Sequence, residues 1–102
     1  MSQRFVDTVQ HEIAEEKAGA LGRTGQRLQQ ALELFRELEQ RTADQAQTRA
    51  HRERLLWELA DRVESLLVQR EACGLRDSRH VLKHYDIPRE AIARVGARRP
   101  KS

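Results

Sequence analysis

The sequence predicts an all-α protein, built from a long helical hairpin and two short C-terminal helices. Three observations lead to this prediction. No proline occurs before Pro88, so long helices can form without the interruption that proline causes. Apolar residues recur at spacings of three and four, the period of one helix face. Only 38% of the 102 residues are hydrophobic and 34% are charged, which is typical of helices with narrow apolar stripes.

The first predicted helix runs from Phe5 to Gln40 and carries two apolar stripes, offset by one residue near position 20. The first stripe contains Val6, Val9, Ile13 and Ala20. The second has the spacing of coiled-coil seam positions and contains Leu21, Thr24, Leu28, Ala31, Phe35 and Leu38. Three glycines coincide with the offset: Gly19, Gly22 and Gly25. They indicate either a break in the helix or a kink at which a neighbouring helix approaches closely.

A second helix is predicted from about Ala46 to Cys73. Just before it, Thr42 with Gln45 and Asp44 with Gln47 have the spacing of a capping box. Its seam contains Leu56, Leu59, Val63 and Leu66, and is widened by Leu55, Ala60 and Leu67. Gly74 is expected to end the helix in the left-handed conformation.

Two short helices follow. Asp77 is expected to cap the first, which runs through Tyr85, and Pro88 to open the second, which runs through Val95 and stops at Gly96. We expect residues 1–96 to form a single helical domain and residues 97–102 a basic flexible tail.

We expect the protein to be cytoplasmic. The lone Cys73 cannot form an internal disulfide, and residues 1–10 lack the apolar run of a signal peptide. No stretch approaches the roughly 20 consecutive apolar residues that span a bilayer, so no membrane contact is expected.

Two segments resemble a known group of proteins. They are EKAGALGRTG at residues 16–25 and VQREACGLRDSRHVLKHYDIPRE at residues 68–90. Together they resemble a small, uncharacterised bacterial family of helical proteins of about this length. The resemblance implies a free-standing bacterial helical protein, and it assigns no activity, cofactor or binding residue.

Charge is distributed unevenly along the chain. Residues 76–102 carry eight Lys/Arg against three acids, a net charge of +5, so the remainder carries −2 of the total of +3. A basic segment of this kind can contact nucleic acid or another anionic partner. The candidate contact residues are Arg76, Arg79, Lys83, Arg89, Arg94, Arg98 and Arg99. Residues 77–95 also have the outline of a helix-turn-helix, although Asp86 stands where the turn usually has glycine.

The chain offers little for catalysis or metal binding. Cys73, Asp77, His80 and His84 have the spacing of metal ligands on one helix face, but Gly74 is expected to interrupt that helix. No nucleophile is paired with a base in the sequence. We therefore predict a protein that is not an enzyme and has no catalytic residue, metal or cofactor.

The two long helices predict self-association. Helices of 28 to 36 residues extend about 40 to 55 Å, more than the compact diameter of so short a chain. We predict a homodimer that completes a helical bundle and buries the seam residues Leu28, Phe35, Leu56, Val63 and Leu66. The expected function is that of a non-enzymatic interaction or adaptor module with an unknown protein partner. The alternative is a small DNA-binding regulator that uses residues 77–95.

Overall fold

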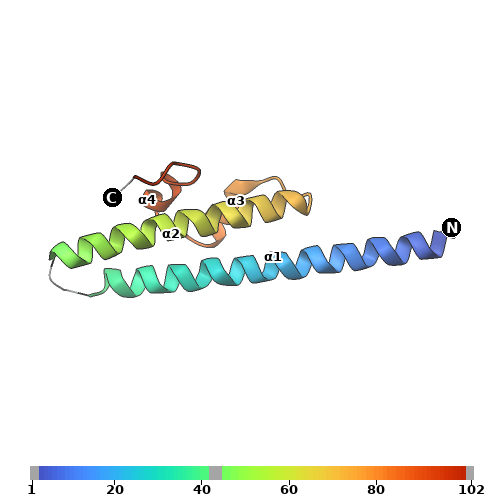
Figure 1. The fold of residues 1–102 in the computed structure, drawn as a ribbon, viewed down its shortest axis with the longest axis horizontal. Helices are drawn as coiled ribbons and strands as arrows, with labels where there is room; N and C mark the ends of the chain where they lie inside the picture. Colours follow the sequence, from blue (N-terminus) through green and yellow to red (C-terminus); the bar gives the residue numbers. More distant parts are fainter. Residues whose placement is uncertain (1–2, 42–44, 101–102) are drawn as a thin grey trace.

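The computed structural model describes residues 3–41 and 45–100 and contains four helices in these ranges: α1 (Gln3–Glu39), α2 (Gln45–Ala72), α3 (Ser78–His84) and α4 (Arg89–Ile92) (Figure 1). The described part of the chain has no β-strand, which confirms the all-α prediction. Helices α1 and α2 pack as an antiparallel hairpin, and α3 and α4 fold back onto it. The result is an elongated body of 65 × 24 × 24 Å.

Helix α1 is continuous through Gly19, Gly22 and Gly25, so a break at these glycines is wrong. Their cost of about 1 kcal/mol each relative to alanine is not enough to interrupt a helix of 37 residues. Close packing occurs at Gly25 alone, where an added Cβ would lie 2.8 Å from the Tyr85 hydroxyl oxygen. At Gly22 an added Cβ would meet nothing within 4 Å. The group that approaches Gly25 is therefore a side chain, not the backbone of another helix. It belongs to residues 75–100, which we call the C-terminal segment.

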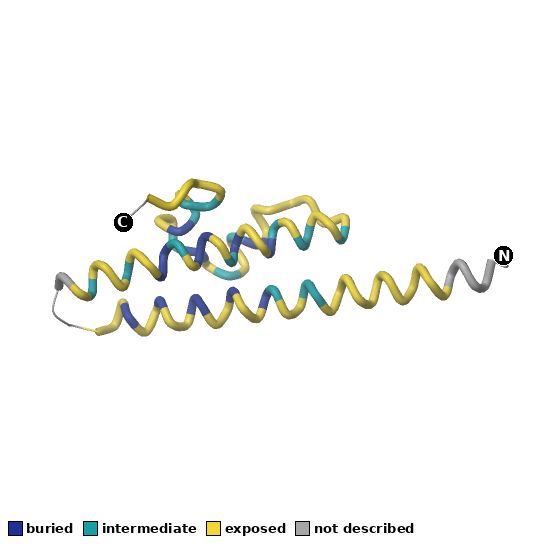
Figure 2. The backbone as a smooth tube through the Cα atoms, in the orientation of Figure 1, coloured by how far each residue is buried: buried dark blue, intermediate teal, exposed yellow. Residues whose placement is uncertain are grey.

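The hydrophobic core lies between α1 and α2, toward the turn that joins them (Figure 2). The five predicted seam residues have at most 4% of their surface exposed: Leu28, Phe35, Leu56, Val63 and Leu66. Val81, Ile87 and Ala91 from the C-terminal segment are buried in the same cluster. The expectation that the seam needs a second chain is therefore wrong, because one chain covers it with its own C-terminal segment.

The end of α2 follows the sequence prediction closely. Gly74 has φ of +84°, and the amide of Leu75 donates to the carbonyl of Arg70 at 2.9 Å, a bond typical of a glycine-capped helix end. Asp77 then caps α3, because its carboxylate accepts a hydrogen bond from the amide of Arg79 at 3.1 Å. The predicted capping residues Thr42 and Asp44 lie outside the described residues.

Helix α4 is shorter than predicted. It ends at Ile92 rather than Val95, because the amides of Arg94 and Val95 donate to carbonyls three residues back instead of four. The turn before it is also unusual, since Asp86 adopts a φ of +53°, which few residues other than glycine tolerate. The second short helix is thus a single turn held in place by its surroundings.

Ion pairs fasten α4 to the hairpin. The Arg52 guanidinium donates to Glu39 of α1 and, through two nitrogens at 2.6 and 2.7 Å, to Glu90 of α4. The hydrogen bond with Arg52 lowers the pKa of Glu90, and the same bonds to Glu90 and Glu39 raise the pKa of Arg52. Arg52 therefore links three helices through one charged group.

The N-terminal part of α1 projects beyond the rest of the hairpin (Figure 1). We call residues 3–16 the arm; it extends past the end of α2, and every side chain described there, from Thr8 onward, is exposed (Figures 1 and 2). Val9 and Ile13 have 37% and 46% of their surface exposed. No helix in the described ranges combines the length and the apolarity that crossing a membrane requires.

Candidate interaction groove

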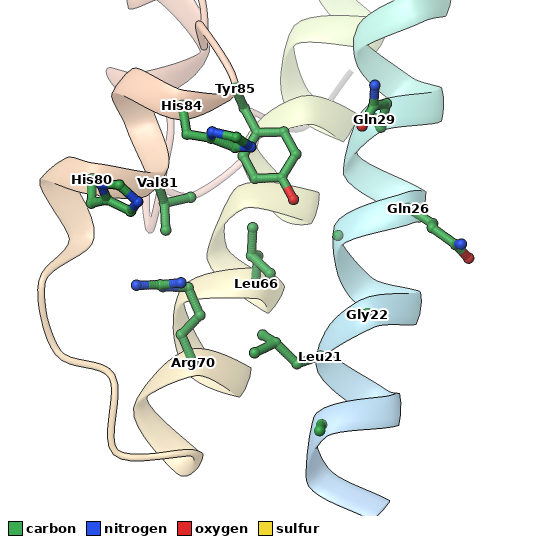
Figure 3. Close-up of a pocket in the computed structure, with 12 residues that line it drawn as sticks. Leu21, Gly22, Gln26, Gln29, Leu66, Arg70, His80, Val81, His84 and Tyr85 are labelled. Atoms are coloured by element: carbon green, nitrogen blue, oxygen red, sulfur yellow. The ribbon is translucent and has the colours of Figure 1, made fainter. Parts of the chain in front are cut away.

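A hollow of about 500 Å³ lies between α1, α2 and α3 (Figure 3). Leu21 and Gly22 of α1 form one wall, and Leu66 of α2 and Val81 of α3 form an apolar floor that is almost fully buried. The α1 wall is open because Gly22 has no side chain to fill the space beside it. The volume lies within the range of about 300 to 1,000 Å³ that is typical of binding sites.

Arg70 brings a positive charge into this hollow. Its side chain extends from α2 toward His80 and Val81 of α3 (Figure 3). The Nε atom is buried and has no hydrogen-bond partner among the described residues. A buried donor without a partner costs about 1 to 3 kcal/mol, and more when it is charged. No carboxylate lines the hollow in the described part of the chain. The positive charge of Arg70 can therefore attract an anion that enters the hollow.

Aromatic side chains border the hollow on the α3 side. The rings of His80 and His84 stack with their centroids 6.2 Å apart, and His84 meets Tyr85 edge to face at 5.0 Å. Tyr85 reaches across to Gly25 of α1, and its carbonyl accepts a hydrogen bond from Arg36 at 3.1 Å. Tyr85 therefore closes one end of the hollow.

A second hollow, of about 450 Å³, lies where α1 passes the end of α2. Its lining is mainly apolar and includes Ile13, Ala14, Ala72, Cys73 and Leu75. The Cys73 thiol lies here, with its sulfur 3.8 Å from the carbonyl oxygen of Lys17. Ala18 and Leu21 line both hollows. The two hollows thus form one surface along α1, from Gln10 to Gln29, which we call the α1 groove.

The predicted anion contacts separate into two groups. Two of them are engaged within the chain: Arg94 binds Glu53 and Arg99 binds Asp61, and both guanidinium groups lie over the Trp57 ring. The other five are exposed: Arg76, Arg79, Lys83, Arg89 and Arg98. The residues predicted as one basic surface are therefore not brought together in one place.

Arg76 is the predicted contact that shares a hollow with Arg70. This hollow, of about 270 Å³, lies beside the turn between α2 and α3, and Glu71 and Ser78 also line it. Arg79 forms an exposed ion pair with Asp77 at 3.5 Å. Two arginines and one carboxylate therefore line this smaller hollow.

Sequence reasoning missed Arg70, although a signal for it exists. The α2 seam residues Leu56, Leu59, Val63 and Leu66 step by three and four, and the next step falls on position 70. An arginine at a seam position indicates a charged group held against the core. His80, His84 and Tyr85 give no comparable signal, because only the fold places them beside α1.

The possible metal ligands are not brought together. Within residues 3–41 and 45–100, no three His, Cys, Asp or Glu side chains lie close enough to hold a metal ion. The histidines contact other groups: His11 lies 2.9 Å from Glu15, His51 lies 3.3 Å from Arg54, and His80 and His84 stack on each other. These contacts give no pairing of a nucleophile with a base among the described residues.

The chain belongs to a family described as a family of unknown function (DUF6665), whose model matches residues 4–101. This membership confirms the resemblance to an uncharacterised family, while a bacterial origin stays a prediction. No curated protein and no solved structure matches the chain.

Proposed function

We propose that this member of the family is a non-enzymatic interaction module of the cytoplasm, whose α1 groove holds an acidic amphipathic helix. The observation that carries the proposal is the position of Arg70: its side chain lines the hollow beside an apolar floor, its buried Nε atom has no partner in the described chain, and no carboxylate among the described residues lines that hollow. An anionic group on an apolar body satisfies both features. The partner contributes the apolar residues to the floor and the acids to Arg70.

The dimensions of the groove favour a helix over a small molecule. From Gln10 to Gln29 the groove follows α1 for about 30 Å, which equals several helical turns. An amphipathic helix lays one apolar face into such a groove and keeps its polar flanks at the edges. Acids on one flank then lie near Arg70 and His80.

Duplex DNA is the alternative partner, and the geometry favours it less. To reach a phosphate, Arg94 would have to leave Glu53 and the Trp57 ring. Helix α4 has only four residues, whereas reading a major groove requires a helix that places several side chains on base edges. We therefore rank the acidic helix first.

Fluorescence anisotropy tests this proposal. The probe is a labelled synthetic helical peptide with leucines on one face and glutamates on the flanks. We expect the protein to bind this peptide, and to bind a lysine-for-glutamate version of it at least tenfold more weakly. Arg70→Gln should weaken binding of the acidic peptide about tenfold or more, as expected for loss of a charge-assisted hydrogen bond.

Lys83→Gln is the matched control. It removes the same charge from an exposed position on α3 that does not line the groove. If Arg70→Gln and Lys83→Gln weakened peptide binding equally, the effect would come from the overall charge of the protein and not from the groove. That outcome would contradict the proposal. Salt-sensitive binding of duplex DNA together with no binding of the acidic peptide would favour the alternative.

A further inference from the structure

The arm has the chemistry that the groove requires. Its sequence has four acids and one arginine, a net charge of −3: the acids are Asp7, Glu12, Glu15 and Glu16, and the arginine is Arg4. Its exposed apolar residues are Val9 and Ile13. A helical segment of this length without tertiary contacts is only marginally stable in water. The chain therefore presents an acidic amphipathic helix that stays exposed, although Gln10, Ile13 and Ala14 border the end of α2 across the second hollow.

We propose that the arm of one chain lies in the α1 groove of a second copy, while the arm of that copy lies in the groove of the first. The inference rests on the proposed function and names the partner that the groove holds. Because each chain gives an arm and receives one, the contact is made twice and closes into a symmetric dimer.

Charge complementarity selects a second copy as the occupant. The groove has Arg70, His80 and His84 along one side and no carboxylate among the described residues that line its first hollow. The arm is acidic where the groove is basic. Pairing the two places opposite charges together, which favours and orients the encounter of the two chains.

The groove has the length that the arm requires. The arm has 14 residues, about 21 Å of helix, and the groove follows α1 for about 30 Å. A two-fold axis makes the two α1 helices antiparallel, so each arm passes along the other helix. The walls there carry Ala14, Ala18 and Gly22, whose small size lets two helices approach closely.

Gly22 is an independent observation in favour of this pairing. A glycine inside a helix is less favourable than alanine, so its presence calls for a structural reason. No group of the same chain occupies the space beside Gly22, because an added Cβ would meet no atom within 4 Å. Gly22 lines the groove, so the arm of a second copy supplies the missing neighbour.

This dimer differs from the one predicted from the sequence. The seam residues Leu28, Phe35 and Leu56 are already buried within one chain and take no part in it. The interface instead uses surfaces that one chain leaves open: the arm and the α1 groove.

Sedimentation equilibrium of the full chain tests the inference. We expect the mass at about 100 µM to approach twice the 11.9 kDa of one chain, and to fall toward one chain near 1 µM. Val9→Asp places a charge in the apolar stripe of the arm, at a position that lines neither hollow, and should weaken the dimer more than tenfold. Leu34→Asp is its control, because Leu34 is exposed on the same helix but does not line the groove.

Gly22→Leu and Gly19→Leu form a second matched pair. Both glycines are exposed on α1, but only Gly22 lines the groove. We expect Gly22→Leu to abolish the dimer and Gly19→Leu to leave it intact, with the helical content of both checked by circular dichroism. A wild-type chain that is monomeric at about 100 µM, or a dimer that survives both Val9→Asp and Gly22→Leu, would overturn the inference.

The acidic peptide separates the two proposals. The monomeric Val9→Asp variant has an unoccupied groove whose lining is unchanged, and it should bind the peptide at least as tightly as the wild type does. A monomeric wild type that still binds the peptide would overturn the dimer and leave the proposed function standing. A dimer whose Val9→Asp variant does not bind the peptide would overturn the proposed function and support the self-association.

Discussion

The two halves of α1 belong to one helix but have different surroundings. Residues 25–38 contribute six buried positions to the core beside α2 and the C-terminal segment. Residues 8–19 are exposed at every position. Both halves have apolar residues at helical spacing, so the sequence pattern alone does not decide burial. The difference teaches that tertiary packing stabilises one half, whereas the other depends on local helix formation or on a partner.

The largest expected contrast is between a core leucine and an arm isoleucine. Leu59 has no exposed surface, so Leu59→Ala should lower the free energy of unfolding by about 2 to 5 kcal/mol. Ile13→Ala at a dilution that keeps the chain monomeric should change it by less than about 0.5 kcal/mol, as expected for an exposed site. Urea unfolding measures both values. Similar losses would show that the arm packs against the body of its own chain.

A smaller contrast concerns two glycines of α1. At monomeric dilution, Gly22→Ala should raise the free energy of unfolding by up to about 1 kcal/mol, because the new methyl group meets nothing. Gly25→Ala should raise the free energy of unfolding by less than Gly22→Ala does, or should lower it. The reason is that its Cβ would lie 2.8 Å from the Tyr85 hydroxyl oxygen. In a Tyr85→Phe background that obstacle is absent, and Gly25→Ala should match Gly22→Ala. If the Gly25→Ala deficit persisted in that background, Tyr85 would not be its cause.

The smallest expected effect concerns the ion pair that holds α4. The Arg52 hydrogen bond lowers the pKa of Glu90 in the folded chain below its ordinary 4.5. The stabilisation is therefore complete above that ordinary value and is lost as the pH falls through the lower, folded-state pKa. The pair is largely exposed, so we expect it to contribute no more than about 1 kcal/mol.

Thermal unfolding across pH 7 to 3 tests this pair. Glu90→Gln should be less stable than the wild type at neutral pH, and the difference should shrink below the ordinary pKa of 4.5. Glu58→Gln is the control, because its ion pair with Arg62 lies within α2 and joins no other helix. An equal and pH-independent loss in both variants would contradict the role of Glu90.

Much of the fold follows from local signals in the sequence. The bounds of α2, the left-handed Gly74 and the Asp77 cap each depend on a few adjacent residues, and each was predictable for that reason. The length of α4 was not, because its end tightens into hydrogen bonds three residues back while Ile92 and Val95 pack against a core formed by distant helices. The burial of the seam within one chain also depends on where the C-terminal segment folds back.

The groove was harder to predict than the fold. Arg70 could be recognised as a cation on the α2 seam, but its lack of a partner is a property of the assembled helices. Tyr85 and Gly25 are 60 residues apart and meet only because the C-terminal segment returns to α1. The charge pattern identified a basic segment, yet it did not reveal that Arg94 and Arg99 are engaged by α2.

Residue-resolved amide hydrogen exchange, followed while the protein is diluted, tests the central contrast most directly. We expect residues 28–38 to be protected equally at every concentration, because one chain buries that part of α1. Residues 8–19 should exchange rapidly at about 1 µM and become protected near 100 µM, where a second copy covers them. Protection of residues 8–19 that did not change with concentration would contradict the account.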